Sequence, residues 1–356
     1  MSFKQLVTGC ALLATLSMAA TQAHATQSFR LAWSLYPGYM PWDYASESGI
    51  VERWAEKYGI EIEIVQINDY VEAINQFTAG EFDAAMMATM DALTIPAASG
   101  RDSTSIAVID YSNGNDVIIM RNGDSLSDLA GKRINIIEYS ISHYFLIRAL
   151  EQVGLSERDV TLVNTSDADM VSLFAHPSTQ AMVTWNPMAS DILQQPDAVN
   201  IYDSSQMPGE LTDSIVVNTA TLEKHPELAK ALLGAWFETM AIMQGDDDAA
   251  VQAREAMGIA AGTDLAGYEQ QLEATYLFYS PEDVVSVMAD QQLQETMANI
   301  ASFSFERGLL GSGQDLSETI GISYPDGSVW GNADNVTLRF NNEFARMAAE
   351  GALQGK

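Results

Sequence analysis

Aromatic side chains are dense in residues 33–44, where five of the twelve residues are Trp or Tyr. They are Trp33, Tyr36, Tyr39, Trp42 and Tyr44. Proline and glycine interrupt the segment, so neither helical nor strand periodicity can bury all five rings in one core. Large rings with polar edges in such a loop are expected to form the wall of a pocket for a small ligand, and a packed loop is the alternative.

Acidic residues accompany such rings in segments that we expect at the carboxyl ends of strands. None of these segments contains Lys or Arg. They are residues 33–44, 66–72, 87–94, 110–116, 138–144, 165–170, 184–191 and 207–213. The candidate ligand contacts that we select from them are Trp33, Tyr36, Tyr39, Trp42, Asp91, Asp110, Asn115, Asp116, Glu138 and Trp185.

This composition favours a ligand that is cationic or rich in hydrogen-bond donors. A site for a sulfonate or nitrate would normally supply a guanidinium or ammonium partner, although helix N-termini can also bind anions. Carboxylates that converge without a cation repel one another and raise their own pKa values. A bound cation would remove that repulsion.

Several of the acidic residues also have a structural explanation. Asp69 precedes Glu72 at the spacing of a capping box, so it is expected to cap a helix. Asp91 could cap its own helix, and Glu138 lies where a strand ends and a helix could begin. Trp185 lies just before a proline that forces a turn, which favours it as a ligand contact.

The elements that must position these residues alternate between strands and helices. Strands are expected at residues 29–34, 60–64, 82–87 and 105–111, with helices at 49–58, 69–79 and from about 91. Further strands are expected at 117–120, 133–137, 160–164, 180–184 and 214–218, and a mostly helical region follows from 226 to 300. This alternation predicts an α/β fold with parallel-rich sheets flanked by helices.

A turn at residues 112–115 suggests that the chain divides into two lobes. We expect lobe 1 to comprise residues 26–113 and 214–356, and lobe 2 to comprise residues 114–213. The lobes would be joined at residues 113–116 and near Asp213. Ligands of open α/β sheets bind beyond the carboxyl ends of the strands, so the ligand cleft is expected between the lobes.

Residues 1–25 have the features of an export signal. Lys4 gives a positive start, residues 6–20 are largely apolar, and residues 23–25 have the small-x-small form of a cleavage site, so cleavage is expected near Ala25. The single cysteine, Cys10, lies in this segment, so we expect neither a disulfide nor thiol chemistry in the rest of the chain. The expected product is a soluble exported protein.

Charge and missing motifs exclude several functions. The formal net charge is −31, and removal of residues 1–25 would make it −32 because that segment holds Lys4 and no acid. Such a charge disfavours binding to nucleic acid and to anionic lipid. The HExxH, GxSxG, P-loop and complete dinucleotide motifs are absent, and there are only four histidines. We therefore expect no metal site, no cofactor and no catalysis.

Residues 125–134 (SLSDLAGKRI) resemble the entry to the second lobe of periplasmic solute-binding proteins of the nitrate/taurine/sulfonate ABC transporter type. Further segments match this family in order, and together they cover about residues 29–245: residues 82–85, 183–187, 215–217 and 225–227. Shorter segments are similar to the branch of the family that accompanies urea carboxylase: residues 33–42, 68–72, 90–96, 110–116 and 322–327.

The resemblance implies a two-lobed periplasmic binding protein of type II. It would close by a hinge motion around a small nitrogen compound and deliver it to the permease and ATPase subunits of an ABC importer. Members of that branch are described as urea-type binding proteins, and the associated pathway also handles guanidine. We place guanidinium before urea, because a planar cation can lie on an aromatic face while carboxylates accept its N–H groups in pairs. Urea is neutral and needs a donor for its carbonyl oxygen.

Other functions remain open at this point. The ligand could be another small solute such as an amine, nitrate or sulfonate, or the protein could present its ligand to a membrane receptor. An enzyme is the remaining alternative, although the pyrimidine-synthesis enzymes that share this fold depend on a cysteine cluster that is absent here. A monomer is expected. A ligand of about four heavy atoms gains at most roughly 6 kcal/mol on binding, which corresponds to a Kd of tens of micromolar.

Overall fold

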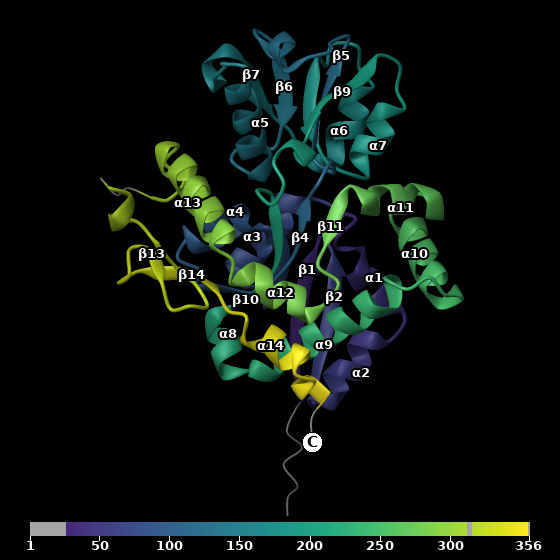
Figure 1. The fold of residues 1–356 in the computed structure, drawn as a ribbon, viewed down its shortest axis with the longest axis vertical. Helices are drawn as coiled ribbons and strands as arrows, with labels where there is room; N and C mark the ends of the chain where they lie inside the picture. The colour runs from purple at the N-terminus through teal and green to yellow at the C-terminus, as the bar shows by residue number, and fades with distance from the viewer. Residues whose placement is uncertain (1–25, 312–314, 355–356) are drawn as a thin grey trace, which may run out of the picture.

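The computed structural model describes residues 26–311 and 315–354, so the export signal predicted at residues 1–25 lies outside the described residues. The chain forms two sheets, each flanked by helices, in a larger and a smaller lobe (Figure 1). The predicted α/β fold with two lobes is confirmed.

Nine strands form the sheet of the larger lobe, in the order β13-β12-β14-β4-β10-β3-β1-β2, with β11 paired to β4. Every residue of β3 is buried, and β10 has a single partly exposed residue, Asp213. Such continuous burial is typical of strands that are covered on both faces. The strands are β1 (Gln27–Trp33), β2 (Ile60–Gln66), β3 (Ala84–Ala88), β4 (Ser103–Ser112), β10 (Thr212–Asn218), β11 (Thr275–Leu277), β12 (Gly321–Ser323), β13 (Val329–Gly331) and β14 (Val336–Phe340).

Five strands form the sheet of the smaller lobe, in the order β7-β6-β8-β5-β9. They are β5 (Val117–Arg121), β6 (Arg133–Ile136), β7 (Thr161–Asn164), β8 (Ala181–Thr184) and β9 (Ala198–Asp203). The helices of this lobe are α5 (Ile141–Gln152), α6 (Asp167–Phe174) and α7 (Met188–Leu193). The chain passes between the two sheets twice, once from β4 to β5 and once from β9 to β10.

The helices of the larger lobe begin and end largely where caps predict. Asp69 caps α3 by accepting a hydrogen bond from the backbone N–H of Glu72 at 2.8 Å, and Gly80 ends that helix with a φ of 89°. The helices are α1 (Met40–Glu47), α2 (Ile50–Lys57), α3 (Tyr70–Ala79), α4 (Thr89–Ala92), α8 (Thr219–Lys224), α9 (Pro226–Met243), α10 (Asp248–Ala260), α11 (Leu265–Glu273), α12 (Pro281–Met288), α13 (Gln291–Glu306) and α14 (Glu343–Ala349).

Both sheets are mixed, although parallel pairing was expected to dominate them. β10 runs antiparallel to β3 and β4, and β5 runs antiparallel to β8 and β9. A chain that leaves one lobe and later returns to it must cross between the sheets in both directions. The strands β4, β5 and β10 lie next to these two crossings. The sequence patterns also missed β9 and the short strands β11 to β14, because runs of three to six residues carry little periodicity of their own.

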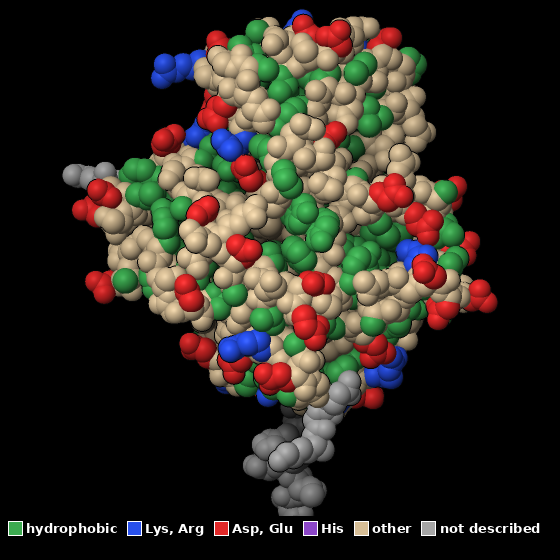
Figure 2. Space-filling model, viewed as in Figure 1, with side chains coloured by type: hydrophobic (Ala, Val, Ile, Leu, Met, Phe, Trp, Pro, Cys, Tyr) green, Lys and Arg blue, Asp and Glu red, His purple; other side chains and the backbone are tan. Residues whose placement is uncertain are grey.

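Acidic side chains are spread over both lobes on the face shown in Figure 2. Within the two described ranges, no helix combines the length and the apolar character that a membrane span requires.

Candidate functional site

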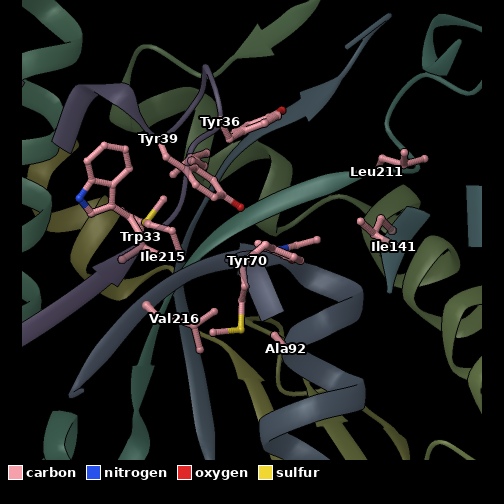
Figure 3. Close-up of a cluster of buried hydrophobic side chains, with 14 of the residues drawn as sticks. Trp33, Tyr36, Tyr39, Tyr70, Ala92, Ile141, Leu211, Ile215 and Val216 are labelled. Atoms are coloured by element: carbon pink, nitrogen blue, oxygen red, sulfur yellow. The ribbon is translucent and has the colours of Figure 1, made fainter. Parts of the chain in front are cut away.

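A small cavity of about 30 Å³ lies between the two sheets. Its walls come from both lobes, and its lining consists of Ser34, Tyr36, Tyr39, Tyr70, Ala88, Asp116, Ile141, Trp185 and Asp213. Figure 3 shows the rings of Tyr36, Tyr39 and Tyr70 gathered around this region, while the Trp33 indole points away from it. The lining contains no Lys or Arg, as the acidic and aromatic segments of the sequence predicted.

Aromatic rings are held in place on opposite sides of the cavity. Tyr36 and Tyr39 follow β1 and pack edge to face, with ring centroids 4.8 Å apart. Tyr70 begins α3 and packs edge to face on Trp185 at 5.8 Å, and Trp185 comes from the smaller lobe directly after β8. The Trp185 Nε1–H donates to the carbonyl oxygen of Leu35 at 3.2 Å, which joins the two lobes. The cavity is thus closed in this structure.

Gly38 allows the aromatic loop to approach the sheet. A Cβ at this position would lie 2.1 Å from Asp110 Oδ2 and 2.6 Å from a ring carbon of Tyr36. Because no real Cβ tolerates such distances, the close approach of Tyr36 to Asp110 requires glycine here. The Tyr36 hydroxyl donates to Asp110 Oδ1 at 3.4 Å.

Asp110 and Asp213 form a carboxyl pair at the base of the cavity. They are cross-strand partners in the register of β4 and β10, so their side chains lie next to each other. The Tyr39 hydroxyl donates to Asp213 Oδ1, whereas Asp110 Oδ2 has no partner among the described residues. Burial and then the charge of Asp213 hold the pKa of Asp110 well above its usual range, and burial raises the pKa of Asp213 to about 6.

Asp91 and Asp116 add two further carboxyl groups. Asp91 Oδ2 accepts hydrogen bonds from the Tyr70 hydroxyl at 2.6 Å and from the backbone N–H of Ile141 at 3.4 Å. Its other oxygen is buried without a partner in the described part of the chain. Asp116 lines the cavity directly. Burial is the main cause that raises the pKa of both groups to about 7.

Carboxylates at helix N-termini also join the lobes beside the cavity. Asp91 of the larger lobe meets the first N–H of α5, and Asp167 of the smaller lobe accepts from the backbone N–H of Tyr70, the first residue of α3, at 3.2 Å. The Ser166 hydroxyl donates to Asp69 Oδ2 at 2.5 Å. Each helix N-terminus is a partial positive charge, so these pairs stabilise the closed arrangement.

Six of the predicted site residues surround the cavity. Tyr36, Tyr39, Asp116 and Trp185 line it. Asp91 and Asp110 lie directly behind its wall, because each accepts a hydrogen bond from a lining tyrosine.

The remaining four lie elsewhere. Trp33 and Trp42 are core residues, and Trp42 donates to the Met86 sulfur at 3.1 Å and packs against Trp236. Asn115 is buried at the crossing between the lobes, where it bonds to the Thr275 hydroxyl at 2.5 Å and to the backbone N–H of Asn186 at 2.8 Å. Glu138 lines a separate cavity of about 200 Å³ beside Tyr139.

Two further residues, Tyr70 and Asp213, belong to the site although they were not selected. Both lie in segments that the sequence marked as free of Lys and Arg. Tyr70 follows the capping residue Asp69, and Asp213 was expected in a lining segment and at a lobe connection, but neither was chosen as a ligand contact. Their roles depend on the pairing of β10 with β3 and β4, which the sequence alone does not reveal.

A wider groove of about 670 Å³ lies over β11 and α12, where apolar side chains gather near the middle of Figure 2. Tyr111 and Tyr276 stack there with ring centroids 4.6 Å apart. Of its three acidic residues, Asp290 is the N-cap of α13, Asp283 completes the capping box of Ser280 at the start of α12, and Glu273 ends α11. We therefore regard the smaller cavity as the candidate ligand site.

The cavity has no arrangement for metal binding. Within the part of the chain that the structure describes, no group of three or more His, Cys, Asp or Glu residues is placed to hold a metal ion. The convergent groups are instead four carboxyls and three tyrosine hydroxyls. This arrangement can accept hydrogen bonds from a planar donor and stack against it.

Similar proteins are known from sequence and from structure. The taurine-binding periplasmic protein of Escherichia coli (strain K12) is 27% identical over 122 residues, which cover 33% of this chain and 38% of that protein. The chain spans 58% of the length of several other curated relatives.

Two solved structures share the fold at low identity. The alkanesulfonate-binding protein of Xanthomonas axonopodis pv. citri has a TM-score of 0.63 at 17% identity, covering 81% of this chain and 96% of that chain. The desulfurization enzyme DSZB has a TM-score of 0.60 at 14% identity, covering 92% and 99%. The family model described as NMT1/THI5 like matches residues 52–250, more than half of the chain. The chain therefore belongs to the NMT1/THI5-like family.

Proposed function

We propose that this chain is the exported, periplasmic solute-binding component of an ABC importer for a small nitrogen compound. Guanidinium is the first candidate ligand and urea the second. The family match and the fold shared with binding proteins support the transport role. The observation that carries the choice of ligand is the cavity itself, which two carboxyl groups line together with tyrosine and tryptophan rings, with two more carboxyl groups directly behind its wall and no Lys or Arg in its lining.

Cavity size favours a very small solute. A water molecule needs about 10–15 Å³ of such volume, so about 30 Å³ accommodates two or three waters or one solute of roughly four heavy atoms. Guanidinium and urea are of that size. A sulfonate with a carbon chain would require the lobes to separate further than they do here.

Charge favours guanidinium over an anion. The carboxyl groups of Asp91, Asp110, Asp116 and Asp213 surround the cavity, and no cationic side chain lines it to balance them. The carboxylates would repel an anion. A planar cation would donate hydrogen bonds to them while it lies against the rings. Binding would thus neutralise charges that burial alone leaves unstable.

Urea is supported by a separate observation. Burial and neighbouring charges raise the pKa of Asp110 well above its usual range, which favours the protonated form of its carboxyl group. A protonated carboxyl is a donor, and it could bind the carbonyl oxygen of urea. The same groups thus suit urea when they are protonated and guanidinium when they are ionised.

A binding role is favoured over catalysis by the groups at the site. The cavity lining holds no histidine, cysteine or lysine, and the nearby hydroxyls of Tyr36, Tyr39 and Tyr70 each donate to a carboxyl group. We further propose that residues 26–113 and 214–356 move as one lobe and residues 114–213 as the other. They would hinge at residues 113–116 and near Asp213, because β4, β5 and β10 flank the two crossings.

Titration calorimetry of residues 26–356 tests this function. Millimolar guanidinium, urea, nitrate and taurine are compared in one buffer with the wild type, Asp116→Asn and Asp191→Asn. Asp116 lines the cavity, while Asp191 is an exposed residue of α7, so the second variant makes the same charge change away from the site. We expect guanidinium to bind the wild type and Asp191→Asn, and to bind Asp116→Asn at least 10-fold more weakly. Binding of nitrate or taurine alone would contradict the proposed ligand.

A further inference from the structure

Asp110 and Asp213 lie opposite each other in a way that two ionised carboxylates would not tolerate. Their backbones are register partners on antiparallel strands, so the two Cβ atoms are neighbours whatever rotamer each side chain adopts. The hydroxyls that donate to them, Tyr36 to Asp110 and Tyr39 to Asp213, belong to rings that pack 4.8 Å apart, so the two carboxyl groups lie side by side at the base of the cavity. Two ionised carboxylates this close repel each other, and one proton shared between them would remove that repulsion.

The surroundings of the pair offer no substitute for that proton. The titratable groups that face it are Tyr36 and Tyr39 from the loop after β1, Tyr70 from α3, Asp91 from α4 and Asp116 before β5. From β11 the facing residues are Thr275 and Leu277, which carry no charge. Every ionisable neighbour is therefore neutral or negative. The Asp110 Oδ2 atom is an unused hydrogen-bond acceptor, because it is fully buried and has no partner in the described ranges.

We propose that the Asp110–Asp213 pair shares one proton in the empty site and releases it to solvent when a cationic ligand binds, which makes this pair the determinant of ligand charge. This inference rests on the proposed function. In the exchange, one guanidinium enters and one proton leaves, so the charge of the site is conserved and no covalent bond to carbon or nitrogen changes. Urea binds without that exchange, because the proton remains available as a donor to its carbonyl oxygen.

The pair suits this role better than Asp91 does. Asp91 is held by the Tyr70 hydroxyl and by the N-terminus of α5, so one of its oxygens already contributes to closure of the lobes. Asp110 and Asp213 each accept a hydrogen bond from a single tyrosine hydroxyl. Loss of the shared proton frees lone pairs on two adjacent carboxylates, and a guanidinium edge can donate to two such oxygens at once.

The first experiment examines the empty protein and does not depend on the ligand. Infrared spectra of residues 26–356 in D₂O are recorded as the pH is raised from about 5 to 8, and the carbonyl stretch of protonated carboxyl groups is followed. We expect the band that persists to the highest pH to disappear in Asp110→Asn and in Asp213→Asn, and to remain in Asp191→Asn. Asn can donate its amide N–H to the remaining carboxylate, so the fold should survive. A band that is unchanged in both pair variants would overturn the shared proton.

The second experiment counts protons. Guanidinium is titrated by calorimetry at one pH, near 6, in two buffers with different ionisation enthalpies. Asp91 and Asp116 are still protonated at this pH and can also lose protons, so we expect the wild type to release about one proton more for each guanidinium bound than Asp110→Asn does, and neither protein to release protons when urea binds. The wild-type affinity for guanidinium should rise with pH by up to about 10-fold per unit until the pair is ionised.

Failure of the inference and failure of the proposed function give different results. Guanidinium binding without proton release would contradict the exchange while leaving guanidinium as the ligand. A protein that shows the infrared band and binds urea, but not guanidinium, would overturn both the proposed cation and the exchange, while the shared proton would stand. If neither solute binds, the proposed function is wrong.

Discussion

Two groups of carboxylates lie near the junction of the lobes, and one of them has arginine partners whereas the other has none. Outside the cavity, Glu157 pairs with Arg307 at 3.0 Å, and Glu210 pairs with Arg148 at 3.1 Å. These four side chains are partly exposed. Inside the cavity, Asp91, Asp110, Asp116 and Asp213 meet tyrosine hydroxyls, backbone N–H groups and one another. The outer group is neutralised within the protein, and the inner group is not.

This difference separates carboxylates that hold the structure from carboxylates that await a ligand. Raising the pKa of one buried carboxyl from 3.8 to about 7 costs about 4 kcal/mol of stability once the group is ionised. An arginine beside such a carboxylate would offset that cost. A positively charged ligand would do the same, and only while it is bound.

The largest effect is expected from Phe303→Ala, which removes a ring beside Arg307 of the outer group. Phe303 of α13 packs edge to face on His143 and Tyr144 of α5, and the Arg307 guanidinium lies 3.7 Å from its ring centroid. We expect a loss of about 3 kcal/mol in the free energy of unfolding, because an aromatic side chain is removed from a buried contact. Affinities for guanidinium and urea should fall by the same factor, since the closed state loses stability irrespective of ligand charge.

Thermal unfolding measures this change, because guanidinium chloride and urea, the usual denaturants, are themselves candidate ligands. Phe303→Leu is the matched control and should retain most of the stability. A selective loss of guanidinium binding in Phe303→Ala would contradict the division between the two groups.

The pH dependence of the ligand-free protein is expected to have the next largest effect. The pKa values of Asp91 and Asp116 are raised by burial from 3.8 to about 7, so the folded state binds more protons than the unfolded state between these values. Stability therefore falls as the pH rises through this window, and the loss is complete above about pH 8. Between pH 6.5 and 8 we expect a loss of about 1 kcal/mol for each of these two groups.

The effect of His143 on stability must be separated from that measurement by the choice of pH range. Burial lowers its pKa to about 4, so its contribution to stability is lost as the pH falls from about 6.5 towards 4, in the opposite direction. Above about pH 6.5 this contribution is constant. A midpoint of thermal unfolding that stays level or rises from pH 6.5 to 8 would contradict the raised pKa values of the cavity carboxyls.

Much of the fold could be predicted from sequence because its signals are local. The capping of α3 by Asp69, its end at Gly80 and the strands β1, β2, β6 and β8 follow from caps and periodicity within a few residues. The direction of β10 could not be predicted in this way, since it depends on which distant strands it joins. The short strand β11 is stabilised by its pairing with the end of β4 and not by its own three residues.

The site was only partly predictable for a similar reason. Composition correctly indicated a cavity free of Lys and Arg, and it identified Tyr36, Tyr39, Asp116 and Trp185 as lining residues. Aromatic density could not show that Trp42 turns into the core, where Met86 and Trp236 receive it. The importance of Asp213 follows from its register with Asp110, which is a long-range property of the sheet.

A smaller effect, opposite in sign to that of most substitutions, is expected from Asp116→Asn. This change removes a buried charge that has no cationic partner among the described residues, but burying the Asn amide offsets most of the about 4 kcal/mol that ionisation costs, so the ligand-free protein should gain about 1 kcal/mol of stability at pH 8. At pH 5 the gain should be lost, because the folded wild-type carboxyl is then protonated and only about 2 kcal/mol remains to offset the cost of the amide. Thermal unfolding at both pH values measures it, with Asp191→Asn as the control for a change of surface charge. A loss of stability at pH 8 would place Asp116 among the structural carboxylates.

The smallest effect is expected from Glu210→Gln, which tests the outer group by the same kind of substitution. Glu210 accepts from Arg148 and from the Tyr144 hydroxyl at 2.9 Å, so loss of its charge should destabilise the protein by about 1 kcal/mol or less, since these side chains are partly exposed to solvent. The amide oxygen can still accept from the tyrosine, which limits the loss. Guanidinium affinity should change less than about 2-fold, because the outer charges are already balanced by arginine.

Calorimetric titration and thermal unfolding of this variant beside Asp116→Asn should therefore give opposite patterns: lower stability with binding retained for Glu210→Gln, and higher stability with binding weakened for Asp116→Asn. If both variants weaken guanidinium binding equally, the ligand responds to the net charge of the closed lobes, and the cavity carboxyls have no special role in recognising it.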